Sequence, residues 1–190
     1  MAAVRVLVIP GSVRKGGLNL QLARLAAGRL TALGAEPTLL DLRALALPIY
    51  DGDLEAESGP PAGARALVEA FAAHDAVLVV SPEYNAFPTP LFINAIDWAT
   101  RLPEHKAAMN GKPTALASAS PGMLGGMRSL LALRNYLAIN PGMLVIPPQF
   151  ALAQAPKAYT ADGALADAGQ QAALEAVLVA LLKTTTALRT

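Results

Sequence analysis

The sequence predicts an α/β fold in which a doubly wound parallel sheet carries helices on both faces. Short apolar runs of strand length alternate with longer stretches in which apolar residues recur at helical spacing. One run, residues 76–80, is apolar throughout, as expected for a strand that is buried on both faces. Alternation of this kind is typical of βαβ units, and here it indicates five parallel strands and five helices.

The first half of the chain supplies two strands and two helices. Residues 4–9 and residues 38–42 predict the first two strands. The stretch between them predicts a helix that a glycine ends. Its apolar residues are Leu22, Leu25, Ala26, Leu30 and Leu33. Residues 43–61, rich in proline, glycine and acidic side chains, predict a long loop, and residues 62–73 predict the second helix.

The second half supplies three strands and three helices. Three apolar runs predict the strands: residues 76–80, 114–117 and 143–146. Thr89 followed by Pro90 predicts a helix start, because threonine caps a helix and proline fits its first position. That helix runs through Ala99, and residues 123–138 predict the next one. The last helix follows a loop rich in proline, glycine and alanine, and carries one apolar stripe: Leu174, Val177, Leu178, Leu181 and Leu182.

The composition is that of a single globular domain spanning residues 1–190. The chain is 54% hydrophobic and 15% charged, which predicts a large core and excludes a disordered protein. Its formal net charge is +1, and lysine and arginine are scattered along it. Nucleic-acid binding needs clustered basic residues, so no nucleic-acid partner is expected.

The chain contains no cysteine, which excludes disulfides, iron–sulfur clusters, thiolate zinc sites and thiol nucleophiles. No metal site is expected. The two histidines, His74 and His105, each stand beside a charged residue in a predicted connector, so both are expected at the surface. A Ser-His-Asp hydrolase would need one of them, and the sequence has no Gly-x-Ser-x-Gly elbow.

No segment predicts a membrane span or a signal peptide. The apolar stretch at the N-terminus is too short for a signal peptide and has no basic segment before it. The longest apolar stretch, residues 172–182, is interrupted by Glu175 and is much shorter than a bilayer requires. We therefore expect a soluble, cytoplasmic protein without a membrane partner.

The loop after the first strand predicts an anion site. In doubly wound sheets the ligand lies beyond the carboxyl ends of the strands, where the strand order reverses, which directs attention to the loops after strands one, three and four. Residues 11–19 read GSVRKGGLN and combine the N–H groups of a helix start with the Ser12 hydroxyl and the Arg14 guanidinium. The loop matches neither the Walker pattern nor G-x-G-x-x-G, so a phosphomonoester fits it best. The alternative is an ordinary solvated turn.

The other two loops predict a seat for a planar ring. Residues 81–90 read SPEYNAFPTP, in which prolines stiffen the loop, Tyr84 and Phe87 can line a ring, and Asn85 offers a donor and an acceptor. Residues 118–128 read SASPGMLGGMR, whose small residues, hydroxyls and N–H groups suit the polar edge of a flavin. The alternative for residues 81–90 is that the prolines only interrupt secondary structure while the aromatic side chains cover the core. The alternative for residues 118–128 is an ordinary loop of small residues.

Together the three loops resemble those of the NADPH-dependent FMN reductase family, especially its bacterial quinone and chromate reductase branch. The family pattern G-S-x-R-x-x-S-x-N is matched by Gly11, Ser12, Arg14 and Asn19. Four further motifs are similar: P-E-Y-N at residues 82–85, N-A-I-D-W at 94–98, S-P-G-x-x-G-G-x-R at 120–128, and L-P-I-Y-D at 47–51. The resemblance covers residues 4 to 150, roughly.

The resemblance implies a flavodoxin-like sandwich with strand order 2-1-3-4-5 and a bound FMN. Ser12, Arg14 and Asn19 would hold the phosphate, residues 82–85 would flank the flavin ring, and Ser120 would reach its polar edge. The full set of implied cofactor-binding residues is Gly11, Ser12, Val13, Arg14, Gly17, Leu18, Asn19, Pro82, Glu83, Tyr84, Asn85, Ser118, Ser120 and Gly122. No catalytic side chain is implied, because N5 of the flavin carries the chemistry.

Two residues depart from the family pattern. Gly17 stands where the family has a serine, which removes one hydroxyl donor, and Ile93 stands where it has a lysine. In the helix that follows, Asn94 and Asp97 are expected to hydrogen-bond neighbouring loops, and Trp98 to lie in the core or an interface. Met123 and Met127 are expected to serve packing.

The function that the resemblance implies is transfer of a hydride from NAD(P)H through FMN to quinones or similar small planar acceptors. Chromate, azo compounds and free flavin are further acceptors to consider, and a ping-pong mechanism with a homodimer or homotetramer is expected. The chief alternative is an electron-carrier flavodoxin that does not itself oxidise NAD(P)H, although flavodoxins are typically strongly acidic. A phosphate-binding regulatory domain without flavin is a third alternative.

Overall fold

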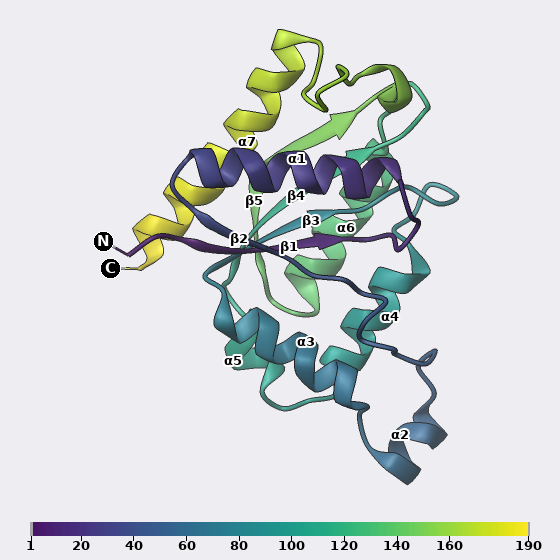
Figure 1. Cartoon of the computed structure of the whole chain (residues 1–190). Coiled ribbons are helices and arrows are strands. Elements are labelled where there is room, and N and C mark those ends of the chain that lie inside the picture. Colours follow the sequence, from purple (N-terminus) through teal and green to yellow (C-terminus); the bar gives the residue numbers. More distant parts are fainter. Residues whose placement is uncertain (1, 190) are drawn as a thin grey trace.

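The computed structural model describes residues 2–189 and contains one five-stranded parallel sheet in the order β2-β1-β3-β4-β5 (Figure 1). The strands are β1 (Arg5–Pro10), β2 (Glu36–Leu39), β3 (Ala76–Val80), β4 (Pro113–Ala119) and β5 (Leu144–Leu152). The predicted fold class, the doubly wound sheet and the strand order are confirmed.

Helices cover both faces of this sheet (Figure 1). One face is covered by α1 (Leu18–Ala32) and α7 (Ala168–Leu188). The other face is covered by α3 (Ala62–Ala73), α4 (Pro90–Ala99), α5 (His105–Met109) and α6 (Met127–Ile139). A short helix, α2 (Gly52–Ser58), buries no residue, and one turn of 3-10 helix (Ala155–Lys157) follows β5.

The two cores follow from the period of two along each strand. In β3, Ala76, Leu78 and Val80 face α1 and α7, whereas Val77 and Val79 face the opposite layer. The face of β4 toward α1 and α7 carries Ala115, Ala117 and Ala119. Small side chains there allow the helices to approach the sheet closely. The start of α1 lies at the carboxyl edge of the sheet because this helix follows β1.

Several predicted boundaries were wrong. Strand β2 lies two to three residues earlier than predicted, and the predicted long loop contains α2. Helix α6 begins at Met127 and not at residue 123, because Gly125 and Gly126 adopt positive φ angles of 61° and 91° and so interrupt the helix.

His74 and His105 are only partly exposed, and each ring Nδ1 contacts a backbone carbonyl.

Strand β5 extends six residues beyond the predicted end, despite Pro147 and Pro148. It lies at the edge of the sheet, where proline is tolerated, and its register shifts opposite residues 114–116 of β4. The side chain of Arg134 compensates for this irregularity. Its guanidinium donates to the carbonyl oxygens of Val145 (3.3 Å), Ile146 (2.8 Å) and Pro147 (3.0 Å), and to Oε1 of Gln149 (3.0 Å).

Helix α7 is longer than the apolar stretch that marks it in the sequence. Its 21 residues have the length and composition of a membrane span, with a mean hydropathy of 1.3 over an 18-residue window. One face of the helix is nevertheless buried against the rest of the protein, and it packs on β4, β5 and α1. The residues buried on this face are Leu174, Val177, Leu178, Leu181 and Thr185. The structure therefore uses α7 as a core helix.

Candidate functional site

Three loops converge at the carboxyl edge of the sheet, after β1, β3 and β4. Strands β1 and β3 are adjacent, and the strand order reverses between them, which is the expected ligand position in this architecture. The loops enclose a pocket of about 140 Å³. Its lining consists of Ser12, Arg14, Gly17, Leu18, Asn19, Pro82, Glu83, Tyr84, Ala119, Ser120 and Pro121. All three loops that the sequence singled out therefore contribute to one pocket.

The first loop is held tightly against the second. The Gly11 N–H donates to the Val80 carbonyl at 2.9 Å, and a side chain at Gly11 would approach Oγ of Ser81 to 2.5 Å. Only glycine fits there. The Thr89 hydroxyl donates to the Gly11 carbonyl at 2.6 Å, so this residue joins the two loops. The sequence predicted Thr89 only as a helix cap, a role that it also fills by accepting from the Phe92 N–H.

The start of α1 presents unpaired donors toward the pocket. Gly17 caps this helix without a side-chain hydrogen bond, and the first bond of the helix joins the Gln21 N–H to the Gly17 carbonyl at 3.0 Å. The N–H groups of residues 18–20 therefore lack partners within the helix, and the helix dipole adds positive potential there. This end of the pocket suits an anion.

Two side chains of the first loop add to this potential. The Ser12 Oγ accepts a weak hydrogen bond from the Arg14 N–H at 3.3 Å, and the hydroxyl remains able to donate. Arg14 is exposed, and no carboxylate of the described residues lies within ion-pair distance of its guanidinium. Arg43 braces the loop from outside by donating to the Val13 carbonyl at 2.9 Å.

Asn19 lines the pocket, but its amide is largely occupied. The side chain is buried, its Nδ2 donates to the Ala119 carbonyl at 2.8 Å, and its Oδ1 accepts from the Ala119 N–H at 2.9 Å. This pair of bonds ties α1 to the end of β4. One Nδ2 hydrogen remains for a ligand, so the main contribution of Asn19 is to position the first loop against the third.

The second loop contains a tight turn that displays aromatic side chains. Tyr84 and Phe87 exchange two backbone hydrogen bonds of 2.9 and 3.0 Å, with Asn85 (φ 53°) and Ala86 (φ 64°) between them. Two positive φ angles at the centre define a type I′ turn, in which asparagine is favoured and alanine is strained. The turn leaves Tyr84 49% and Phe87 57% exposed.

Glu83 joins the second loop to the start of α6. Its carboxylate accepts from Nε of Arg128 at 2.7 Å, from a second guanidinium nitrogen of Arg128, and from the N–H groups of Arg128 (3.1 Å) and Ser129 (3.3 Å). Burial alone would raise the pKa of Glu83, but these bonds and the charge of Arg128 outweigh it and lower the pKa. The negative charge also lies favourably at a helix N-terminus.

The third loop is shaped by contacts beneath it. Ser118 is fully buried and its hydroxyl donates to the Gly125 carbonyl at 2.5 Å, so it supports the loop from below. A side chain at Gly126 would meet Oγ of Ser118 at 2.7 Å, and one at Gly125 would meet the backbone of Ala151. The Gly-Gly pair is therefore required by packing as well as by φ.

Ser120 is the hydroxyl of the third loop that reaches the pocket. It is partly exposed, and its Oγ accepts from the Gly122 N–H at 3.2 Å. Beyond it, Met123 is 74% and Met127 is 37% exposed, so the prediction that these methionines serve internal packing was wrong. Five of the residues implied by the resemblance do not line the pocket: Gly11, Val13, Asn85, Ser118 and Gly122.

Helix α4, after the second loop, holds the segment around Pro48 and Tyr50 by hydrogen bonds, as predicted for Asn94. Nδ2 of Asn94 donates to the Pro48 carbonyl and its Oδ1 accepts from the Tyr50 N–H, both at 2.8 Å, and Nε1 of the buried Trp98 donates to the same carbonyl. Asp97 accepts from the Tyr136 hydroxyl on α6 at 2.9 Å, so its partner is a helix and not a loop. The pKa of Tyr136 is raised mainly by burial of its hydroxyl and, to a smaller extent, by this hydrogen bond to Asp97.

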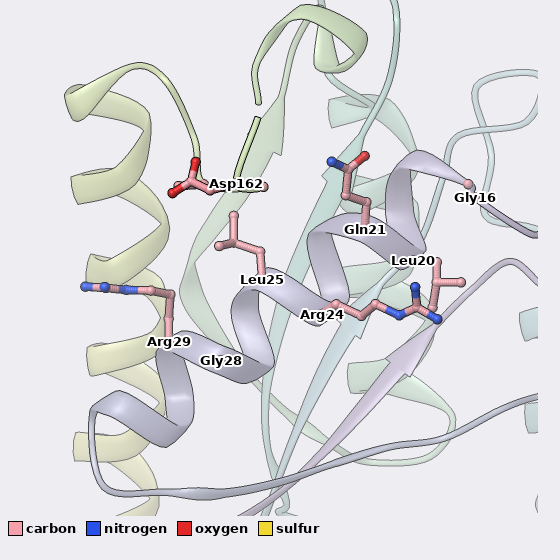
Figure 2. Close-up of a pocket in the computed structure, with 11 residues that line it drawn as sticks. Gly16, Leu20, Gln21, Arg24, Leu25, Gly28, Arg29 and Asp162 are labelled. Carbon is pink, nitrogen blue, oxygen red and sulfur yellow. The ribbon is translucent and has the colours of Figure 1, made fainter. Parts of the chain in front are cut away.

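A larger hollow of about 640 Å³ lies along the outer side of α1 (Figure 2). It is bounded by α1 and the turn at Asp162, and Leu20, Gln21 and Arg24 line it. It meets the three loops only through Gly16 and Gly17. Although this hollow is larger than the pocket, neither the second nor the third loop lines it. The smaller pocket, where donors from three loops converge, is therefore the better candidate for chemistry.

Comparison with known proteins supports this choice. The family model described as NADPH-dependent FMN reductase matches residues 4–157. The chain is 36% identical over 150 residues to a quinone reductase of Escherichia coli, covering 77% of this chain and 76% of that protein. It is 36% identical over 164 residues to an NAD(P)H-dependent FMN reductase of Pseudomonas aeruginosa, covering 86% and 85%.

Solved structures give the same relationship. The flavoenzyme NAD(P)H:(acceptor) oxidoreductase from Paracoccus denitrificans superimposes with a TM-score of 0.83 and 32% identity, over 97% of this chain and 98% of that one. A flavodoxin from the domain Archaea superimposes with a TM-score of 0.58 and 9% identity, over 96% and 99%. At that identity the flavodoxin shows only a shared fold.

Proposed function

The chain belongs to the NADPH-dependent FMN reductase family, and we propose that it oxidises NAD(P)H at a bound FMN and reduces quinones. Chromate, azo compounds and free flavin are further acceptors within this proposal. The observation that supports it most is the meeting of three motif-bearing loops in one pocket. Its lining includes the exposed ring of Tyr84 and the guanidinium of Arg14, which forms no ion pair among residues 2–189.

The residues of the pocket fit FMN. The N–H groups at the start of α1, the Ser12 hydroxyl and the Arg14 guanidinium would hold the phosphate, which is the donor set that a phosphomonoester prefers. The one carboxylate of this lining, Glu83, is already paired with Arg128 and so repels an anionic ligand less. The Ser120 hydroxyl would reach the polar edge of the ring.

FMN, when bound, supplies the hydride chemistry. The task of the chain is to bind and orient. Asn19 fixes the distance between the first and third loops, Glu83 fixes the second loop against α6, and the type I′ turn fixes Tyr84. None of these side chains has to transfer a proton, which agrees with a pocket lined by neither histidine nor cysteine.

We infer that the two substrates use one open face in turn. The pocket of about 140 Å³ is smaller than the roughly 300–1,000 Å³ of ordinary ligand clefts, so the loops wrap only part of a cofactor. All three loops lie at the carboxyl edge of the sheet, so they would cover one face of the flavin ring and leave the other open. A nicotinamide and a planar acceptor that need the same outer face exclude each other, which gives ping-pong kinetics.

Steady-state kinetics test this proposal directly. Double-reciprocal plots against NAD(P)H at several quinone concentrations are expected to be parallel. Intersecting lines, together with an equilibrium assay in which both ligands bind at once, would mean that a second pocket exists. Slow NAD(P)H oxidation by the pure holoprotein would favour the flavodoxin alternative.

We also propose that the protein is a homodimer or homotetramer. Large apolar side chains are exposed around the third loop and α6, and clustered apolar surface marks contact sites. They are Met123, Leu124, Met127 and Leu131. On α4, by contrast, Asn94 and Asp97 are engaged within the chain, so α6 is the better candidate for the interface. A monomeric mass by light scattering at micromolar concentration would contradict this.

A further inference from the structure

A third hollow, of about 340 Å³, lies on the other side of the first loop from the pocket. It is bounded by the first loop, the start of α1, the edge strand β2 and the residues that follow this strand. Its lining consists of Pro10, Ser12, Val13, Lys15, Leu20, Arg24, Leu39, Leu40, Asp41, Leu42 and Arg43. Ser12 lines both this hollow and the pocket, so the two are neighbours with the first loop between them.

Positive charge dominates the rim of this hollow. Lys15, Arg24 and Arg43 are all exposed, and the one acidic residue of the lining is Asp41. Asp41 accepts from the Arg43 N–H at 2.9 Å, and within residues 2–189 no carboxylate lies at ion-pair distance from any of the three cations. Among residues 2–189 the three cations of the lining therefore outnumber its one carboxylate and form no ion pair.

Arg24 and Arg29, five residues apart on α1, differ in their partners. Arg29 points toward α7 and pairs with Glu175. Arg24 points the other way and lies beside Leu20, between the hollow along α1 and the one beside β2 (Figure 2). A surface arginine without a partner is ordinary, but three cations around one hollow make an anion site.

The floor of the hollow is apolar. Leu20, Leu39 and Leu40 line it, and Leu39 on the edge strand is 42% exposed. An apolar floor with a cationic rim suits a flat ring system that carries a phosphate. Inorganic phosphate alone would not use the floor, and an uncharged ring would not use the rim.

We propose that this hollow binds the adenosine end of NADPH, with Lys15 and Arg24 contacting the 2′-phosphate. The inference rests on the proposed function, because the nicotinamide of the same molecule would lie at the pocket while its pyrophosphate crosses the first loop on the side of Lys15. NADH has a hydroxyl in place of this phosphate, which carries a charge of about −1.5 to −2 at neutral pH. The protein therefore selects NADPH over NADH.

Kinetics of Arg24 variants test this selection. In Arg24→Ala, kcat/KM for NADPH is expected to fall by about tenfold to a hundredfold, the range for a lost hydrogen bond to a charged group, and in Arg24→Glu further. For NADH the same variants are expected to stay within about twofold of the wild type, and Arg24→Lys to keep much of the preference. Arg65→Ala, on α3, is the matched control, because Arg65 is also exposed and makes only a 4.0 Å contact with Glu104.

A binding measurement separates this inference from the proposed function. By calorimetry on the holoprotein, adenosine 2′,5′-bisphosphate is expected to bind at least about tenfold more tightly than adenosine 5′-monophosphate, and Arg24→Glu to remove the difference. Equal binding of the two nucleotides, or a wild type that uses NADH as well as NADPH, would overturn the inference and leave the reductase intact. A protein that binds the bisphosphate but cannot oxidise NADPH would instead overturn the proposed function.

Discussion

Arg14 is the residue on which the phosphate end of the site depends most. It is the one guanidinium in the lining of the pocket, and no ion pair within the described chain holds it. Arg14→Ala is expected to weaken FMN binding by about 1.5–3 kcal/mol, or roughly tenfold to a hundredfold in Kd. A fluorescence titration measures this, with Arg65→Ala as the control. Unchanged affinity would remove Arg14 from the site.

Gly17 offers a gain of function at the same end. Its φ of −66° and ψ of 144° are accessible to serine. It occupies the N-cap position of α1, where serine is more favourable than glycine. The added Cβ would lie 3.0 Å from the Arg14 carbonyl, so the exposed first loop must move slightly. Gly17→Ser is expected to tighten FMN binding by adding a hydroxyl donor. Weaker binding would mean that the first loop cannot yield.

The sequence identified the residues of the site better than their roles. Motif matching found Asn19 and Ser118, but a motif does not reveal which way a side chain points. The structure turns the Asn19 amide onto Ala119 and the Ser118 hydroxyl onto Gly125. Thr89, which joins two loops through the Gly11 carbonyl, was predicted only as a cap because its second partner lies 78 residues away.

Between elements, Glu83 is the connection that links the second loop to α6. Its side chain is only 8% exposed, whereas that of Arg128 is 59% exposed. Glu83→Gln is expected to destabilise the FMN-free protein by about 1 kcal/mol, because water screens the lost ion pair on the Arg128 side. Urea unfolding measures this, with Glu57→Gln on the exposed α2 as the control. Equal losses in both variants would show that the connection contributes nothing specific.

The elements that the sequence misplaced are those that lack a hydrophobic period. All five strands were predicted, but β2, whose four residues read EPTL and have no apolar run, was placed two to three residues too late. Helix α2 buries no residue and α5 has only five residues, so neither leaves an apolar stripe to detect. The extension of β5 through Pro147 and Pro148 depends on an edge position and on Arg134, and neither is visible in local sequence.

Across the whole molecule, Asp75 ties the two chain ends to the sheet. Its carboxylate pairs with Arg5 in β1 and with Arg189, whose guanidinium also donates to the Ala2 and Ala3 carbonyls, and Figure 1 shows the ends side by side. Burial alone would raise the pKa of Asp75, but the bonds from Arg5 and Arg189 lower it from 3.8 to about 2.

A depressed carboxylate pKa makes this contribution dependent on pH. It is fully present above the unfolded pKa and is lost as the pH falls from 3.8 toward about 2, since the native carboxylate then becomes protonated. Asp75→Asn is therefore expected to be less stable than the wild type at neutral pH and to match it only below about pH 2. Urea unfolding at several pH values measures the difference. A difference that persists unchanged at the lowest pH would show that charge is not its source.

The proposed function requires that this pocket hold FMN and give it access to NAD(P)H. An absorption spectrum of the purified protein, followed by anaerobic titration with NADPH and then with a quinone, tests it most directly. We expect the yellow absorption of a flavin, with one FMN per chain, which NADPH bleaches and the quinone restores. A colourless protein that takes up no FMN, or a yellow one that NADPH and NADH leave unchanged, would contradict the proposed function.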